Sequence, residues 1–406
     1  MTTDRSPTPS RATQRRGVVV AVAVCCGVTV ANIYLALPLL TLIAESFGLT
    51  PGAAGAVATS GQIGYAAGLF FLVPLGDMVR RRRLVSALLL GTVLALVIGA
   101  TATGLAHLAA AAALIGLLTV VPQVLIPFIA QVVPPDRQGR ALSAVQAGMM
   151  SGIVLSRVIG GNLGQQFGWR DVYLVAAVLT ALAGAVTVWI LPDEPVRERQ
   201  SYPALMASLF ALLAKESRLR WACALQVLTF GAFSLIWTSL VFLLTSSPFE
   251  YSVATAGLFG LFGLISAAGA PIAGRLIDTR GPGTILPIYL GVLLLAALAF
   301  CFAQSQVALI IAGIILLNLG AQGVQVANQT TVFTLFPQAR SRVNTVFMVS
   351  SFAGGAIAAQ LGASLYGANG WRAVSLAALV IAAVSLVVWL LGAMVAKRST
   401  KSEVAV

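Results

Sequence analysis

The side chains of this chain that could do chemistry are the few polar ones inside long apolar segments. Arg157 is the one charged residue near the middle of such a segment, which runs over roughly 141–166. A charge at that depth is costly, so it normally serves a ligand, an ion or a partner inside the protein. Two roles are open for Arg157. Its guanidinium binds an anionic or carbonyl-rich part of a substrate, or changes partners during a working cycle; alternatively, it binds helix-end carbonyls or a nearby Gln for structural reasons.

Uncharged polar side chains in the other apolar segments form a second group of candidates. An amide buried among apolar helices needs a hydrogen-bond partner, so each of these residues either contacts a substrate or joins two helices. Gln123 and Gln325 stand out because they occupy equivalent positions in the internal repeat described below. Besides Arg157, the candidates for substrate contact are Asn32, Tyr34, Gln62, Tyr65, Gln123, Gln226, Trp237, Gln322, Gln325 and Asn328.

The chemistry that the sequence lacks narrows its function further. No carboxylate lies deep in an apolar segment, since Glu45, Asp77, Glu250 and Asp278 all lie at segment ends. Without a buried acid, a cationic substrate and a simple carboxylate proton relay are disfavoured, and a neutral or anionic substrate fits better. The single histidine, His107, is peripheral, and the sequence has no metal-ligand spacing and no Gly-Lys-Ser/Thr nucleotide loop. We therefore expect no enzymatic activity, no cofactor and no metal.

The composition places most of the chain inside a lipid bilayer. Apolar residues make up 59% of the 406 residues, charged residues make up 9%, and the mean hydropathy is +0.95. A soluble chain of this length needs far more charge on its surface. A helix needs about 20 apolar residues to cross a bilayer. About twelve such segments are present, at roughly 17–43, 53–76, 84–104, 107–130, 141–166, 172–192, 219–245, 253–277, 284–304, 306–333, 341–366 and 372–396.

The net charge of +13 does not indicate nucleic-acid binding, because of where the basic residues lie. Of the 25 Lys and Arg residues, 22 lie in the two ends of the chain, in alternate loops or at the segment ends beside them. The other side holds Arg170 and Arg372. Cytoplasmic loops are enriched in Lys and Arg. We therefore expect a multi-pass protein of the bacterial cytoplasmic membrane, with both termini in the cytoplasm.

The sequence also repeats itself once. Gly168-Trp169-Arg170 recurs as Gly370-Trp371-Arg372, and Arg140 recurs as Arg342 at the same offset of 202 residues. A parallel duplication of six helices is typical of transporters. The expected fold class is an all-α membrane protein with twelve transmembrane helices in two pseudo-repeated six-helix bundles. The expected parts are a cytoplasmic tail (1–16), a first bundle (17–192), a cytoplasmic linker with a short interfacial helix (193–218), a second bundle (219–396) and a cytoplasmic tail (397–406).

Small residues form a stripe along segment 141–166, and the stripe recurs in segment 341–366. Helices in lipid associate through close packing of such faces. A static packing surface and a surface on which helices slide fit this pattern equally well. The helix-packing candidates are Gly148, Gly152, Ser156, Gly160, Gly354 and Gly362.

One short motif resembles a known family. The run Gly274-Arg275-Leu276-Ile277-Asp278-Thr279-Arg280-Gly281 is similar to the G-x-x-x-D-x-x-G signature between the second and third helices of each half in the major facilitator superfamily. The first-half copy, 73–83, keeps Asp77 and the basic tail but has Val73 and Arg80 in place of the glycines. The resemblance covers nearly the whole chain, and it implies a latch between the halves, because a carboxylate is stabilised at a helix N-terminus. The implied latch residues are Asp77, Arg81, Arg82, Arg140, Asp278, Arg280 and Arg342.

The resemblance also implies a function similar to that of bacterial drug or sugar efflux members. We expect a monomeric secondary active transporter in the lipid bilayer that exports a small neutral or anionic organic compound by alternating access. Protons are a candidate coupling ion. However, the antiporter signature g-x-x-x-G-P-x-x-G-G is matched at Gly152, Gly160 and Gly161 but has Ser156 and Arg157 at its second Gly and its Pro. The alternatives are a proton-independent uniporter, an importer of a small metabolite, and a non-transporting membrane sensor or scaffold.

Overall fold

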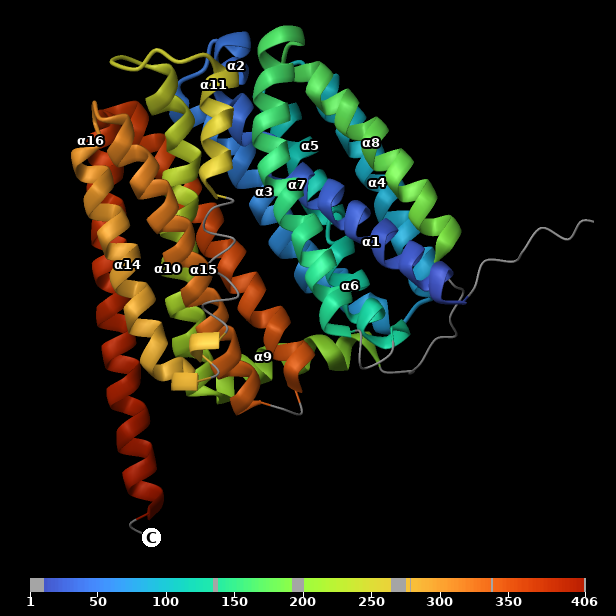
Figure 1. Cartoon of the computed structure of the whole chain (residues 1–406), viewed down its shortest axis with the longest axis vertical. Coiled ribbons are helices and arrows are strands. Elements are labelled where there is room, and N and C mark those ends of the chain that lie inside the picture. Colours follow the sequence, from blue (N-terminus) through green and yellow to red (C-terminus); the bar gives the residue numbers. More distant parts are fainter. Residues whose placement is uncertain are drawn as a thin grey trace, which may run out of the picture.

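The computed structural model describes residues 11–133, 138–191, 201–263, 275–277, 279–336 and 339–404. Within these ranges the regular elements are all helices, so the predicted all-α fold class is confirmed. Figure 1 shows two groups of helices, one from each half of the chain. They lie close together at the end that carries α2 (Leu40–Phe47) and α11 (Val253–Leu258), called here the far end. The helix α9 (Tyr202–Lys215) runs across the opposite end, called the linker end.

Prolines divide two of the long apolar segments of the first half into shorter helices. Pro38 falls in the short 3₁₀ turn η1 (Leu37–Leu39), which separates α1 (Arg11–Tyr34) from α2. Pro122 is the second residue of α6, and it ends the preceding helix because it has no N–H to donate and its ring excludes a continuing α-helix. The predicted segment 107–130 is therefore two helices. The remaining elements of this half are α3 (Pro51–Phe71), η2 (Val73–Asp77), α4 (Arg81–Ala100), α5 (Leu105–Leu118), α6 (Val121–Val132), α7 (Gln138–Phe167) and α8 (Trp169–Ile190).

The second half follows the same plan. The helix α9 lies where the sequence predicts a short helix in the linker, whereas the preceding residues 192–200 lie outside the described ranges. Most of the predicted segment 253–277 also lies outside them. The elements after α9 are α10 (Ser217–Thr245), α11, η4 (Phe259–Leu261), α14 (Pro282–Phe302), α15 (Val307–Leu335) and α16 (Arg340–Val404).

The twelve predicted spans can be compared with helix length and composition. In the described part of the chain, nine helical stretches are long and apolar enough to cross a membrane. The last of them, Arg342–Met394, has 53 residues and contains a break at Gly370, so it covers two predicted spans. The stretches that contain α3 and α11 are not among the nine. The count of twelve fits this arrangement and stays a prediction.

The repeated Gly-Trp-Arg motif forms the same turn in both halves. Gly168 has φ +93° and Gly370 has φ +66°, backbone values that side chains with a Cβ rarely adopt. Each glycine lets the chain reverse between two long helices, and a Trp begins the next helix. The motif therefore repeats because a left-handed backbone is needed at two equivalent bends.

The stripes of small residues lie at equivalent helix contacts. In the first half, a Cβ on Gly152 would collide with the carbonyl group of Gly27, so α7 and α1 touch through their backbones. In the second half, a Cβ on Gly354 would lie 2.6 Å from the carbonyl oxygen of Val227, so α16 and α10 make the corresponding contact. Close backbone approach is how helices associate when lipid surrounds them.

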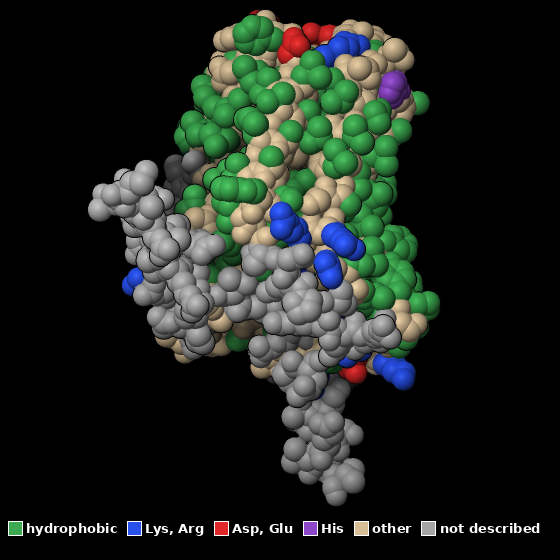
Figure 2. All heavy atoms as spheres, turned by 90° about the vertical axis from the view of Figure 1, so that its right-hand side faces the viewer, with side chains coloured by type: hydrophobic (Ala, Val, Ile, Leu, Met, Phe, Trp, Pro, Cys, Tyr) green, Lys and Arg blue, Asp and Glu red, His purple; other side chains and the backbone are tan. Residues whose placement is uncertain are grey.

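The surface has the distribution expected of a protein in lipid. Figure 2 shows hydrophobic side chains over the middle of one face, with Asp, Glu and His side chains near the far end. Several large apolar side chains point outward, including Trp189 (82% exposed), Ile357 (72%) and Phe302 (71%). Exposed apolar surface of this extent marks a surface that water does not cover.

Candidate substrate site between the halves

Arg157 lies in the seam between the two halves. Its side chain, on α7, is 4% exposed. The guanidinium carbon lies 3.5 Å from the ring centroid of Trp237, on α10 of the other half, and 5.9 Å from that of Tyr34. The nitrogens Nε and Nη2 are buried and have no hydrogen-bond partner among the described residues. The charge is thus stabilised by aromatic faces, while two of its strong donors remain available to an incoming acceptor.

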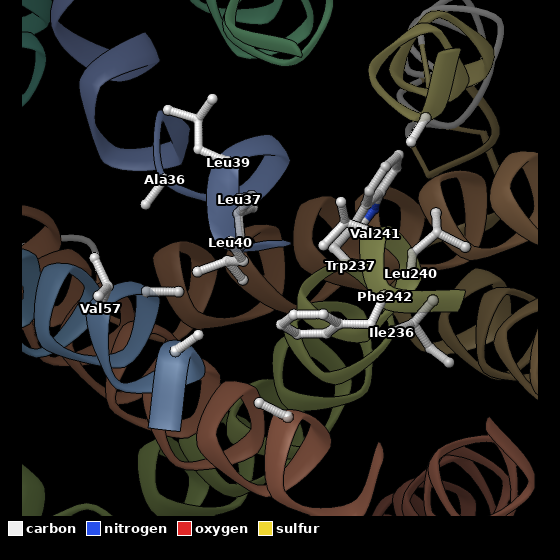
Figure 3. Close-up of a cluster of buried hydrophobic side chains, with 14 of the residues drawn as sticks. Ala36, Leu37, Leu39, Leu40, Val57, Ile236, Trp237, Leu240, Val241 and Phe242 are labelled. Carbon is white, nitrogen blue, oxygen red and sulfur yellow. The ribbon is translucent and has the colours of Figure 1, made fainter. Parts of the chain in front are cut away.

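The surroundings of Arg157 are apolar and tightly packed. A void of about 20 Å³ is lined by Arg157, Trp237, Leu37, Pro38 and apolar residues of α10 and α11. Figure 3 shows Leu37 and Leu40 of the first half on one side, and Trp237 and Val241 of α10 on the other. A Cβ on Gly260 would lie 3.0 Å from side-chain carbons of Arg157. The seam is therefore closed around Arg157.

Hydrogen bonds of Gln165 and Gln360 join the halves at the far end. The backbone N–H of Val253 donates to Oε1 of Gln165 over 3.1 Å. The Nε2 atom of Gln360 donates to the carbonyl oxygen of Gly52 over 2.9 Å. Together with the packing around Arg157, these contacts close the far end of the seam.

At the linker end the seam holds a cavity of about 420 Å³. Arg81 and Gln123 reach it from the first half, Arg342 and Asn344 from the second. The helix α9 contributes Leu205 and Leu209. The volume falls within the usual range for small-molecule sites, about 300–1,000 Å³.

A row of aromatic rings lies between the cavity and Arg157. We call it the aromatic row; its members are Tyr65, Phe352, Phe230, Phe233 and Trp237. Consecutive ring centroids along this order are 4.4, 5.0, 5.6 and 6.2 Å apart. These spacings lie within the contact range of aromatic pairs. Tyr65 has Gln123, a cavity residue, as a hydrogen-bond partner.

Gln62 is a further predicted site residue in the seam. It is buried beside the aromatic row, where its Oε1 accepts a hydrogen bond of 3.4 Å from the hydroxyl of Ser234 on α10. The structure therefore brings Arg157, Tyr34, Trp237, Gln62, Tyr65 and Gln123 to the seam or to the cavity that continues it.

Three predicted amides make contacts within one half instead. Asn32 donates from Nδ2 to the hydroxyl of Thr180 over 3.0 Å. Asn328 donates from Nδ2 to the carbonyl oxygen of Ala222 over 2.8 Å. Gln226 donates from Nε2 to the hydroxyl of Ser351 over 3.3 Å. Each of these bonds joins two helices of the same half, which is one of the two roles that the sequence left open.

The two glutamines of α15 that were predicted as substrate contacts, Gln322 and Gln325, differ from each other. Gln322 contacts the other half, since its Nε2 lies 3.8 Å from the sulfur of Met150 on α7. Gln325 is half-buried and is not among the residues that line the cavity, unlike its repeat counterpart Gln123. The two positions are equivalent in sequence, but their surroundings differ.

The implied latch is only partly covered by the described residues. Arg81 and Arg342 line the same cavity from opposite halves, and Arg82 is half-buried. Arg140 and Arg280 are exposed. Asp278 lies outside the described residues, as does the side chain of Asp77. The latch stays a prediction.

The aromatic row includes residues that were not among the sequence-based candidates. Phe230, Phe233 and Trp237 follow one another at spacings of three and four residues, so they share one face of α10. That spacing was the available signal. Phe352 joins them from α16, and nothing in the sequence points to this contact. Among the described residues, no group of three or more His, Cys, Asp or Glu side chains could hold a metal ion.

Comparison with known proteins identifies the family. The model of the Major Facilitator Superfamily matches residues 22–359 and 288–405. The uncharacterized transporter YgaY of Escherichia coli O157:H7 is 40% identical over 372 residues, which cover 91% of this chain and 94% of YgaY. "Probable transporter SCO4007" of Streptomyces coelicolor is 42% identical over 357 residues, covering 87% and 82% of the two chains.

A solved structure shows the same fold. The bacterial homolog of the human lysosomal transporter Spinster, in an inward-facing and unoccupied conformation, superposes with a TM-score of 0.75 at 14% identity. The match covers 95% of this chain and 98% of that one. These relatives are transporters and not enzymes, in agreement with the expectation from sequence. The chain belongs to the Major Facilitator Superfamily of membrane transporters.

Proposed function

We propose that this protein is a secondary active transporter that moves a small organic anion across the bacterial cytoplasmic membrane by alternating access. The observation that carries the proposal is Arg157, a buried cation in the seam whose Nε and Nη2 have no hydrogen-bond partner in the part of the chain that the structure describes. Hydrogen bonds between an ionised donor and an anion are about twice as strong as neutral ones. Among the neutral and anionic substrates that the sequence allows, this environment favours the anion.

The two ends of the seam support alternating access. The far end is closed by packing and by the hydrogen bonds of Gln165 and Gln360, whereas the linker end holds the cavity of about 420 Å³. Most Lys and Arg residues lie in the chain ends, in alternate loops and in the linker that contains α9. Cytoplasmic loops are enriched in Lys and Arg, so we propose that the linker end faces the cytoplasm. In this orientation the structure is the inward-facing state of the cycle.

We propose export as the direction of transport. A chloramphenicol resistance protein of Streptomyces lividans is 29% identical over 274 residues, and resistance by a membrane transporter is most simply achieved by export. No carboxylate accompanies Arg157 among the described residues that line the void, which argues against a carboxylate proton relay at this point. Uptake of a small metabolite by the same site is the alternative.

The test is counterflow of labelled organic anions into proteoliposomes containing the purified protein. Arg157→Ala should abolish counterflow, and Arg157→Lys should restore little of it, because an ammonium cannot present two parallel N–H groups. Arg372→Ala, at an exposed position outside the seam, is the matched control and should transport normally. Normal counterflow by a folded Arg157→Ala protein would refute the proposal.

A further inference from the structure

We infer that the transported anion is a monocarboxylate with a flat aromatic body, bound with its carboxylate on Arg157 and its ring system against the aromatic row. This inference rests on the proposed function and specifies its substrate. It follows from three features of the seam: the edge of the guanidinium that is free, the number of charges at the site, and the arrangement of the rings.

The free edge of Arg157 has the geometry of a carboxylate receptor. The two unpartnered atoms, Nε and Nη2, lie on the same edge of the planar guanidinium, where an N–H bond of each points outward in parallel. A carboxylate meets such a fork with both oxygens, in two parallel N–H···O bonds. The face of the guanidinium is already occupied by Trp237 at 3.5 Å, so a ligand approaches along the edge.

The charge at the site selects a monoanion. Arg157 is the only charged residue among the described residues that line the void beside it. A dianion such as a phosphate monoester would bring a second negative charge into an apolar environment with no second cation, and an uncompensated buried charge is strongly unfavourable. A carboxylate carries the one charge that Arg157 neutralises.

The aromatic row supplies the surface for the rest of the molecule. Phe230, Phe233 and Trp237 present their rings along one face of α10, and Phe230 and Phe233 are stacked with an interplanar angle of 18°. Phe352 and Tyr65 continue the row to Gln123 at the cavity. A planar aromatic ligand entering from the cavity can stack on successive rings, which an aliphatic ligand of equal volume cannot do.

The present volume at Arg157 shows that binding requires local rearrangement. The void of about 20 Å³ beside Arg157 is smaller than one aromatic ring, whereas the cavity of about 420 Å³ at the other end of the aromatic row has room for a bicyclic acid. The ligand therefore reaches Arg157 when the rings of Phe230 and Phe233 turn aside. Closure of the linker end behind it would complete the occluded state.

The test uses three probes that vary the ring system and the anionic group separately. 2-Naphthoate is planar, aromatic and singly charged; decahydro-2-naphthoate has the same charge and carbon skeleton but no aromatic ring; 2-naphthyl phosphate keeps the ring and carries a second charge. Binding to the detergent-solubilised full chain is measured by isothermal titration calorimetry, and transport by counterflow. We expect 2-naphthoate to bind about three- to tenfold more tightly than its saturated analogue, and the phosphate to bind more weakly than either carboxylate.

Two variants separate this inference from the proposed function. Phe233→Leu keeps an apolar side chain of similar size, so the variant should fold and still bind both carboxylates. The ratio of the affinity for 2-naphthoate to that for its saturated analogue should fall toward one. Arg157→Ala should lose both carboxylates. Equal binding of the aromatic and saturated acids would overturn the inference while leaving an anion transporter. Tighter binding of the phosphate would do the same. If the unaltered protein bound none of the three anions, both this inference and the proposed function would be overturned.

Discussion

The guanidinium of Arg157 lies 3.5 Å from the ring centroid of Trp237, and the two residues belong to opposite halves of the chain. This contact has consequences for how the seam opens. A cation on a desolvated Trp face is stabilised by about 1–2 kcal/mol. In the proposed alternating-access cycle the two partners separate when the halves part at the far end, so their attraction should favour the closed seam.

Replacing Trp237 by Leu should therefore open the far end more often. The lost attraction of about 1–2 kcal/mol corresponds to a roughly 5- to 30-fold rise in the ratio of open to closed molecules. Labelling of a Leu37→Cys reporter by a membrane-impermeant maleimide, in a background without the four native cysteines, measures that ratio. Trp237→Phe retains an aromatic face and should show a smaller rise. Unchanged labelling in Trp237→Leu would show that the pair does not hold the seam.

A second prediction for the same seam concerns Gly257, where α11 approaches α7 closely. A Cβ there would collide with the backbone carbonyl oxygen of Arg157, so Gly257→Ala disfavours the closed far end by about 1–3 kcal/mol. We expect slower counterflow with normal expression and a normal elution profile on size exclusion. The control is Gly291→Ala, because nothing lies within 4 Å of a Cβ at Gly291. Equal transport rates for the two variants would mean that α7 and α11 do not need this close approach.

A third prediction concerns whether Asn32 contacts the substrate or joins two helices. Its Nδ2 donates to Thr180 within the first half, so Thr180→Val leaves a buried amide donor unpaired. The free energy of unfolding should fall by about 1–3 kcal/mol, with the KM for the substrate unchanged. Thermal unfolding and counterflow measure the two effects, with the exposed Thr101→Val as control. A raised KM without loss of stability would return Asn32 to the substrate site.

The cavity at the linker end should be accessible to a water-soluble reagent from the cytoplasmic face of the membrane. A cysteine at position 344, which lines the cavity, should react with an impermeant reagent in inverted membrane vesicles faster than in right-side-out ones. Leu37→Cys should react slowly in both, since it lies in the closed seam. The reverse order for position 344 would place the linker end outside the cell and contradict the proposed orientation.

Much of the architecture could be predicted from the sequence, because the bilayer imposes strong patterns on it. Arg157 was identifiable because a lone charge among apolar residues is rare and costly. The turns at Gly168 and Gly370 were marked by the repeat. The interruptions at Pro38 and Pro122 have a cause in proline chemistry, but segments 17–43 and 107–130 were predicted as continuous helices.

The aromatic row was harder to predict, for a physical reason. In a chain with 18 Phe residues, one more aromatic side chain in an apolar helix carries little information. Phe352 meets Phe230 only because α16 packs on α10, and such contacts depend on helix rotation that the sequence pattern does not specify. The same holds for Asn32 and Asn328, whose need for a partner was evident but whose partners were not.

In the proposed cycle, the membrane voltage acts on the guanidinium of Arg157, which has no acidic neighbour among the described residues that line its void. The empty carrier holds one positive charge in the seam, and a bound monoanion cancels it, so the membrane voltage acts on the unloaded step. One charge moved through the whole field is worth about 2.3 kcal/mol per 100 mV. An interior-negative voltage draws the empty carrier to its cytoplasm-facing state, where it reloads, and each outward delivery carries one negative charge out of the cell. A potassium diffusion potential set with valinomycin should therefore accelerate anion efflux from proteoliposomes when the inside is negative and slow it when the sign is reversed.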